Sequence, residues 1–127
     1  MNQKFNPAFD YDKYGNNYSN IRQEEPKIAK YINKELTDCK TILNVGAGAG
    51  SYEPKEKYII ALEPSIEMRK QRIEKGKFPA VIGKSAEIPF DNNSFDCCIS
   101  ILSIHHWPDM KKGLFEMMRV LYQEKKY

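Results

Sequence analysis

The feature that most constrains this chain is a short strand-like run, Thr41–Val45, that leads directly into glycine at alternate positions: Gly46, Gly48 and Gly50. A short apolar run that ends in a tight turn is typical of a buried strand in a parallel sheet. The glycines permit positive φ and let a ligand approach the backbone closely. Successive N–H groups of such a loop can face an anion or a carboxylate. The pattern predicts a nucleotide-type site at the end of this strand.

Strand-like and helix-like patterns alternate along the rest of the chain. The predicted strands are Thr41–Val45, Tyr58–Leu62, a weak third at Ala80–Ile82, and Phe95–Ile101. One helix is predicted from Pro26, and a second over Ile66–Lys75, capped by Ser65 and stopped by Gly76. A third opens at Pro108-Asp109, and its predicted inner face is Leu114, Met117, Met118 and Leu121. Alternating strands and helices predict an α/β fold with right-handed crossovers.

Composition bounds the chain further. Its 127 residues suggest one domain, 24–127, preceded by an aromatic-rich arm, 1–23. The net charge is only +3 and the basic residues are scattered, so there is no dedicated nucleic-acid signal. Neither a membrane-spanning run nor a secretory signal is present, which favours a cytoplasmic protein. Accordingly, Cys39, Cys97 and Cys98 are expected as reduced thiols without metal-ligand spacing.

The residues after the first two strands narrow the kind of nucleotide. The dinucleotide pattern G-x-G-x-x-G needs glycine where Ser51 stands, and the Gly-Lys-Ser/Thr of a Walker loop is absent. Glu63 ends the second strand, where its carboxylate can accept hydrogen bonds from both ribose hydroxyls of an adenosine. A nicotinamide-dependent oxidoreductase remains an alternative, because that class shares a glycine loop and an acid.

Four stretches in this order resemble class I S-adenosylmethionine-dependent methyltransferases, in the small-molecule group that includes the ubiquinone and menaquinone enzymes. They are TILNVGAGAGS (41–51), ALEPS (61–65), GKSAEIPFDNNSFD (83–96) and SILSIHHWPD (100–109), which runs into LFEMMRVL (114–121). The resemblance implies a Rossmann-like three-layer sandwich with about four parallel strands in the order 3-2-1-4. It also implies S-adenosylmethionine as cofactor, S-adenosylhomocysteine as product, and an unidentified small-molecule acceptor.

The resemblance also implies which residues contact the cofactor. The methionine moiety and ribose would lie against Asn44, Gly46, Ala47, Gly48 and Gly50, with Glu63 on the ribose hydroxyls. The adenine would lie near Pro64, Ser65, Ser85, Ala86 and Glu87, and the sulfonium near Ser100, Ile101 and Leu102. The arm would close over the cofactor through Tyr18 and Arg22, with Arg22 able to pair with the methionine carboxylate. His105 and His106 are candidate general bases, although packing at the start of the next helix is the favoured explanation for them.

Three departures from the family pattern qualify this reading. Asn44 stands where most relatives have Asp, which removes a negative charge near the sulfonium. Only Ser51–Lys57 separates Gly50 from the second strand, which is too short for a full crossover helix, so at most one helical turn is expected there. The loop amides should therefore do most of the anchoring of the cofactor. The chain also ends before the family's remaining strands. The edge of the fourth strand is therefore expected to be exposed and to favour self-association.

Two functional alternatives to a methyltransferase remain open. A non-catalytic remnant would bind the cofactor or a partner without turnover. The nicotinamide-dependent oxidoreductase is disfavoured by Ser51 and by the PFDNNSFD segment, residues 89–96.

Overall fold

A three-stranded parallel sheet lies at the centre of the protein. The computed structural model describes residues 24–101, 103–104 and 107–123. Its strands are β1 (Thr41–Val45), β2 (Tyr58–Leu62) and β3 (Cys97–Ile99), in the order β2-β1-β3. β1 pairs in register with β2 along its whole length, and its Ile42–Asn44 part pairs with β3. The predicted α/β class is confirmed.

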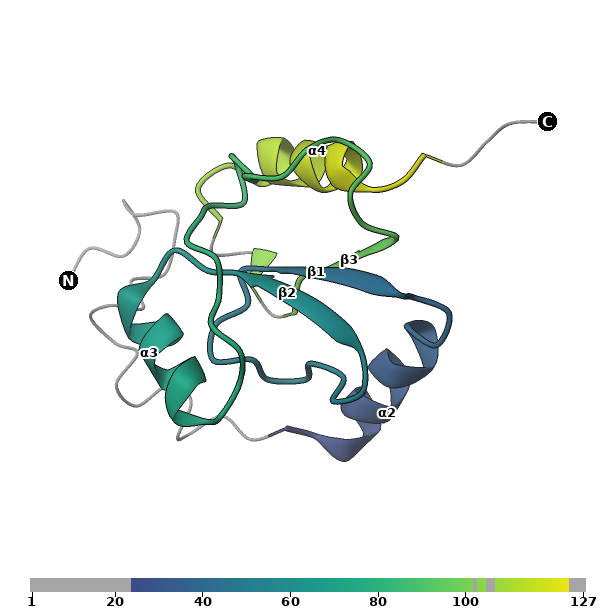
Figure 1. Ribbon diagram of the computed structural model, residues 1–127, viewed down its shortest axis with the longest axis vertical. Coiled ribbons are helices and arrows are strands. Elements are labelled where there is room, and N and C mark those ends of the chain that lie inside the picture. Colours follow the sequence, from purple (N-terminus) through teal and green to yellow (C-terminus); the bar gives the residue numbers. More distant parts are fainter. Residues whose placement is uncertain (1–23, 102, 105–106, 124–127) are drawn as a thin grey trace.

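Helices cover both faces of the sheet (Figure 1). α2 (Pro26–Glu35) and α3 (Ile66–Glu74) lie on one face, and α4 (Met110–Val120) lies on the other. The capping side chains are those of Glu25, Ser65 and Asp109, each of which accepts a hydrogen bond from a backbone N–H of the first turn. The predicted helix starts are confirmed.

The predicted third strand is not a strand. Over Ala80–Ile82 only Val81 forms a bridge, with Leu62, where the Val81 N–H donates to the Ala61 carbonyl at 2.7 Å. Pro79 has no N–H to extend this pairing, and Ile82 is 68% exposed. The order 3-2-1-4, which includes this strand, is therefore not confirmed.

The predicted fourth strand, Phe95–Ile101, is shorter than expected and forms only as β3. Just before it, Phe95 bridges Leu121 in parallel, and the Tyr122 N–H donates to the Phe95 carbonyl at 2.8 Å. The chain after α4 thus begins to cover the outer edge beside β3. Self-association through this edge stays a prediction.

Apolar side chains form two clusters, one on each face, because side chains alternate along β1. The larger cluster lies under α4, and its buried members are Leu43, Val45, Leu62, Ile88, Phe95, Trp107 and Val120. The smaller cluster lies under α2 and consists of Leu36, Cys39 and Ile42.

The inner side of α4 differs from the predicted one. Leu114 and Met118 are 42% and 66% exposed, whereas the buried residues of the helix are Gly113, Glu116 and Val120. Glu116 faces inward, toward the segment that precedes β3. Its carboxylate accepts a hydrogen bond from the Ile88 N–H at 2.9 Å. The apolar stripe alone therefore placed the helix wrongly for Leu114 and Met118.

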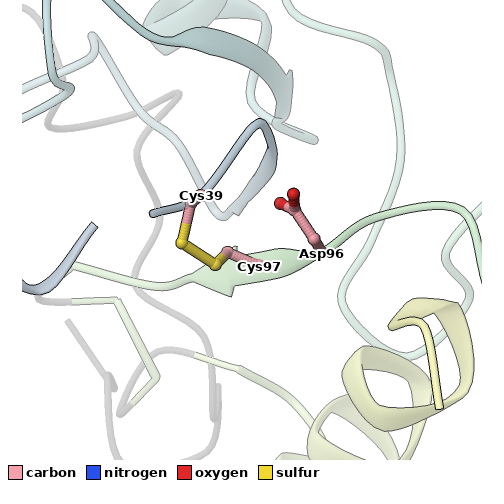
Figure 2. A group of neighbouring side chains, drawn as sticks. All are labelled: Cys39, Asp96 and Cys97. Carbon is pink, nitrogen blue, oxygen red and sulfur yellow. A yellow bond between two sulfur atoms is a disulfide. The ribbon is translucent and has the colours of Figure 1, made fainter. Parts of the chain in front are cut away.

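A disulfide joins Cys39, just before β1, to Cys97 of β3 (Figure 2). The prediction of reduced thiols is wrong for these two residues. They are 58 residues apart in sequence, but the pairing of β1 with β3 brings their Cα atoms to 6.0 Å, within the usual range for a disulfide. Asp96 reinforces this approach, because its carboxylate oxygens accept hydrogen bonds from the N–H groups of Lys40 and Thr41 at 2.8 and 2.9 Å.

The same three side chains have the proximity of metal ligands. The two sulfurs are bonded to each other, however, and a disulfide offers no thiolate to a metal. Cys98 is a half-buried free thiol, and burial raises its pKa to about 12.

The connection from β1 to β2 contains no helix over residues 51–57, in agreement with the prediction. It leaves a hollow of about 650 Å³ beside α2. Tyr52 ties it to the start of α2: its N–H donates to the Glu24 carboxylate at 2.9 Å, and its hydroxyl accepts from the Glu25 N–H at 2.6 Å. Within the described ranges, no helix has the length and apolar character needed to cross a membrane.

Candidate functional site

The glycine loop leaves β1 with left-handed backbone conformations. Gly46, Gly48 and Gly50 have φ of +69°, +57° and +96°, which side chains other than glycine rarely adopt. At Gly46 the space is also closed, because a Cβ there would lie 2.7 Å from Ser103 Oγ and 3.4 Å from Trp107 Nε1. The loop is therefore packed directly against the residues that follow β3.

Several N–H groups of the loop donate to acceptors within the chain, and the expectation that the loop amides anchor the ligand stays a prediction. The N–H groups of Gly46 and Ala47 donate to the Leu62 carbonyl at 2.9 and 3.0 Å, and that of Gly50 donates to the Ala47 carbonyl at 3.1 Å. The end of β2 lies beside the loop and offers an acceptor that sequence spacing does not reveal. The glycines of the loop thus let neighbouring groups approach the backbone closely, while several of their N–H groups already donate within the chain.

The carboxylate that this loop meets is that of Glu63. Glu63 is 2% exposed; its Oε1 accepts from the Gly48 N–H at 2.6 Å and its Oε2 from the Ser65 N–H at 2.9 Å. These bonds fix the acid between the glycine loop and the start of α3. The position lies at the carboxyl ends of β1 and β2, where ligands of open α/β sheets bind.

A polar group after β3 completes this edge of the site. The hydroxyls of Ser100 and Ser103 are 2.6 Å apart, and Ser103 Oγ also donates to the Val45 carbonyl at 3.3 Å. Trp107 is buried in the larger apolar cluster. Its Nε1 has no hydrogen-bond partner among the described residues. Ser103 was missed from sequence, because only the fold brings it against Gly46.

A second missed group lies beneath the loop. Asn44 Nδ2 donates to Glu53 Oε2 at 2.7 Å, and Glu53 pairs with Arg72 of α3. All three residues are buried. The amide oxygen, Asn44 Oδ1, has no partner within the described part of the chain. The substitution of Asn for Asp was visible in the sequence, but the link to Glu53 and Arg72 was not.

The remaining predicted cofactor residues differ in exposure. Ser65 and Ser85 are buried, Ala86, Ser100 and Ile101 are half-buried, and Pro64 and Glu87 are exposed. Five predicted residues lie outside the described ones: Tyr18, Arg22, Leu102, His105 and His106. Their assigned roles stay predictions.

The described residues fit a nucleoside cofactor with a charged amino-acid part. A rigid carboxylate suits ribose hydroxyls, and Glu63 provides it beside backbone without Cβ atoms. A buried acceptor without a donor is rare in native proteins and calls for a partner, and Asn44 Oδ1 is one.

Comparisons with known proteins bear directly on this site. Residues 43–126 match the family model of the methyltransferase domain. An uncharacterized protein of Methanocaldococcus jannaschii is 34% identical over 115 residues, which cover 90% of this chain and 44% of that protein. The tRNA (carboxymethyluridine(34)-5-O)-methyltransferase of Schizosaccharomyces pombe is 26% identical over 87% of this chain and 49% of that protein.

The fold has a solved counterpart. The crystal structure of a SAM-dependent methyltransferase of Thermotoga maritima superposes with a TM-score of 0.77 and 22% identity, over 89% of this chain and 56% of that one. The chain spans less than half the length of the two relatives matched by sequence. By its family match the chain belongs to the methyltransferase domain family, and it shares the Rossmann-like fold of a SAM-dependent methyltransferase.

Proposed function

We propose that this protein transfers a methyl group from S-adenosylmethionine to a small-molecule acceptor. The observation that carries the proposal is the contact between Gly48 and Glu63, a buried carboxylate fixed against a glycine loop at the edge of a parallel sheet. The cofactor supplies an electrophilic methyl group on a sulfonium. The chain's own residues bind the cofactor, orient it and exclude water from the reacting atoms.

The acceptor class is suggested by a second hollow, of about 380 Å³, between α2 and the end of β3. It is lined by Tyr31, Ile32, Glu35, Leu36, Ile99, Ser100 and Ile101. Ser100 and Ile101 are also the residues proposed for the sulfonium side, so an acceptor here would lie next to the methyl group. The size and mainly apolar lining favour a small acceptor with an apolar body.

Transfer in this site would be a direct in-line displacement at the methyl carbon, with S-adenosylhomocysteine released. Such a step depends mainly on aligning the acceptor atom, the methyl carbon and the sulfur. His105 and His106 remain the candidates for a general base when the acceptor must lose a proton. An acceptor atom that is already a good nucleophile would need neither histidine.

Calorimetric titration tests the cofactor site. The protein is expected to bind S-adenosylmethionine and S-adenosylhomocysteine, with NADH as the negative control. Glu63→Ala should weaken both by about tenfold or more, because the carboxylate accepts charge-assisted hydrogen bonds. Glu74→Ala, at the exposed C-terminal end of α3, removes a carboxylate outside the site; it is the matched control and should bind normally. Binding of NADH alone would favour the oxidoreductase. If the folded protein binds none of these ligands, the glycine loop has only a structural role.

Transfer RNA is a second acceptor class, favoured by the S. pombe relative, which acts on a tRNA uridine. Methyl-labelled S-adenosylmethionine should be incubated separately with a small-molecule extract and with bulk tRNA. Label in the small-molecule fraction alone is the expected result. Label in tRNA would instead identify tRNA as the acceptor. Cofactor binding without label in either fraction would support the non-catalytic alternative.

A further inference from the structure

A buried ion pair beneath the glycine loop supports an inference that rests on the proposed cofactor site. Arg72 of α3 donates through Nη1 to Glu53 Oε2 at 2.7 Å and through Nη2 to Glu53 Oε1 at 2.9 Å. The two side chains are only 3% and 6% exposed. Arg72 Nε also donates to the Phe78 carbonyl. Two parallel contacts of this kind fix both direction and distance, so Glu53 has a single position in the fold.

This pair determines which way the Asn44 amide faces. Asn44 Nδ2 donates to Glu53 Oε2 at 2.7 Å. A flipped amide would set Asn44 Oδ1 against the carboxylate, acceptor against acceptor. The amide oxygen is therefore directed away from Glu53. There it is buried and has no hydrogen-bond partner among the described residues.

The position of this oxygen relates it to the cofactor. Asn44 precedes Val45 at the carboxyl end of β1, directly before the glycine loop. In the segment 51–57, which replaces a crossover helix, Glu53 supplies the carboxylate that Asn44 lacks. We propose that Glu53 and Arg72 are positioning residues, which hold the Asn44 amide so that its oxygen accepts a hydrogen bond from the methionine half of the bound cofactor.

The test compares two ligands that differ in that half. S-adenosylhomocysteine contains the amino-acid part, whereas 5′-methylthioadenosine has the adenosine and thioether without it. Asn44→Ala leaves the ion pair in place and should weaken S-adenosylhomocysteine by about tenfold, with 5′-methylthioadenosine unchanged. The Kd values are measured by calorimetry at a temperature where melting curves show every variant folded.

A charge swap tests the roles of Glu53 and Arg72. Asn44→Asp puts a second carboxylate where the amide donor lies 2.7 Å from Glu53 Oε2, and should weaken S-adenosylhomocysteine more than Asn44→Ala does. Adding Glu53→Gln to it restores a donor–acceptor pair and should return the Kd to within about threefold of the unaltered protein. Asn33→Asp, which adds the same charge on exposed α2, is the matched control and should leave both affinities unchanged.

Three results would overturn the inference. One is a lower melting temperature with an unchanged Kd, which would make the network purely structural. Another is equal weakening of both ligands by Asn44→Ala, and the third is a double variant no better than Asn44→Asp. If the unaltered protein binds neither ligand, the proposed function fails and the inference fails with it.

Discussion

The two faces of the sheet are held together by different means. Under α4, one apolar cluster joins the sheet to Trp107 and Val120. On the face of α2 and α3 the apolar cluster is small, and the Cys39–Cys97 disulfide and the Glu53–Arg72 pair make the main connections. Apolar packing is non-directional, whereas a two-contact ion pair fixes particular atoms. Asn44, proposed to face the cofactor, lies on the face with directional contacts.

Each face also has a glutamate–arginine pair, and the two pairs differ in burial. The side chains of Arg72 and Glu53 are 3% and 6% exposed, whereas those of Arg119 and Glu116 are 26% and 8% exposed. Arg119 also donates to the carbonyls of Ile88 and Phe90, so its pair clamps a loop to α4. Because Arg119 is partly exposed, solvent weakens its interaction with Glu116 by screening. The same chemistry thus positions a site on one face and secures a loop on the other.

Breaking the fully buried pair should have the largest effect on stability. Arg72→Met leaves the Glu53 carboxylate buried without its cation, and should lower the free energy of unfolding by about 3–5 kcal/mol. Urea unfolding measures the loss. Lys70→Met, on the exposed side of α3, is the control and should change stability little. A loss for Arg72→Met as small as that of the control would contradict the role assigned to the pair.

Removing apolar volume tests the opposite face. Leu43 is fully buried in the cluster under α4. Leu43→Ala should lower the free energy of unfolding by about 2–5 kcal/mol, through lost burial and the cavity left behind. Met118→Ala, on the exposed side of α4, should cost far less. Similar losses for the two variants would mean that α4 does not pack in the described orientation.

Opening the disulfide tests the second directional contact. Cys39→Ser should lower the free energy of unfolding by about 2–4 kcal/mol under oxidising conditions, because the cross-link no longer restricts the unfolded chain. Adding a reducing agent should remove most of the difference between the variant and the unaltered protein. A difference that persists unchanged in reductant would show that the sulfurs are not bonded in solution.

A smaller effect is expected at the contact between α4 and the site. Gly113→Ala would place a Cβ 2.5 Å from Trp107 Cε3. It should cost about 1–3 kcal/mol by overpacking, although alanine stabilises most helix interiors by about 1 kcal/mol relative to glycine. In a Trp107→Leu background the same change should become nearly neutral or stabilising. Thermal unfolding of the four proteins checks the reversal of sign.

The smallest effect concerns pH and the partly exposed pair. The hydrogen bond from Arg119 holds the pKa of Glu116 below its usual value. The ionised carboxylate therefore adds stability at pH values above the unfolded-state pKa of about 4.3. This contribution is lost as the pH falls through the lower pKa of the folded state. The stability difference between the unaltered protein and Glu116→Gln should shrink on acidification. A difference that grows toward low pH would reverse the assignment.

Local patterns predicted most individual elements well. β1 and β2 have the predicted bounds, and α3 begins after Ser65 and ends shortly before Gly76. Periodicity and capping residues act over a few neighbouring positions, so the sequence contains the needed information. The prediction of a third strand was wrong because strand pairing there depends on which segment lies beside β2, and this is not a local property. The site follows the same division: the glycine loop and Glu63 were each recognised as cofactor-site candidates, but neither the hydrogen bond between Gly48 and Glu63 nor the use of loop amides by Leu62 was foreseen.

By itself, the sequence determined the fold class, the positive-φ loop after β1 and the acid at the end of β2. These depend on apolar runs, on glycine and on a strand end, all local properties. Only the tertiary structure decided that Cys39 meets Cys97, that Glu116 faces inward, and that Arg72 compensates Glu53 beneath Asn44. Each of those contacts joins elements that are brought together by strand pairing or helix packing. A buried polar group is satisfied by whatever lies across that packing, and no local pattern specifies it.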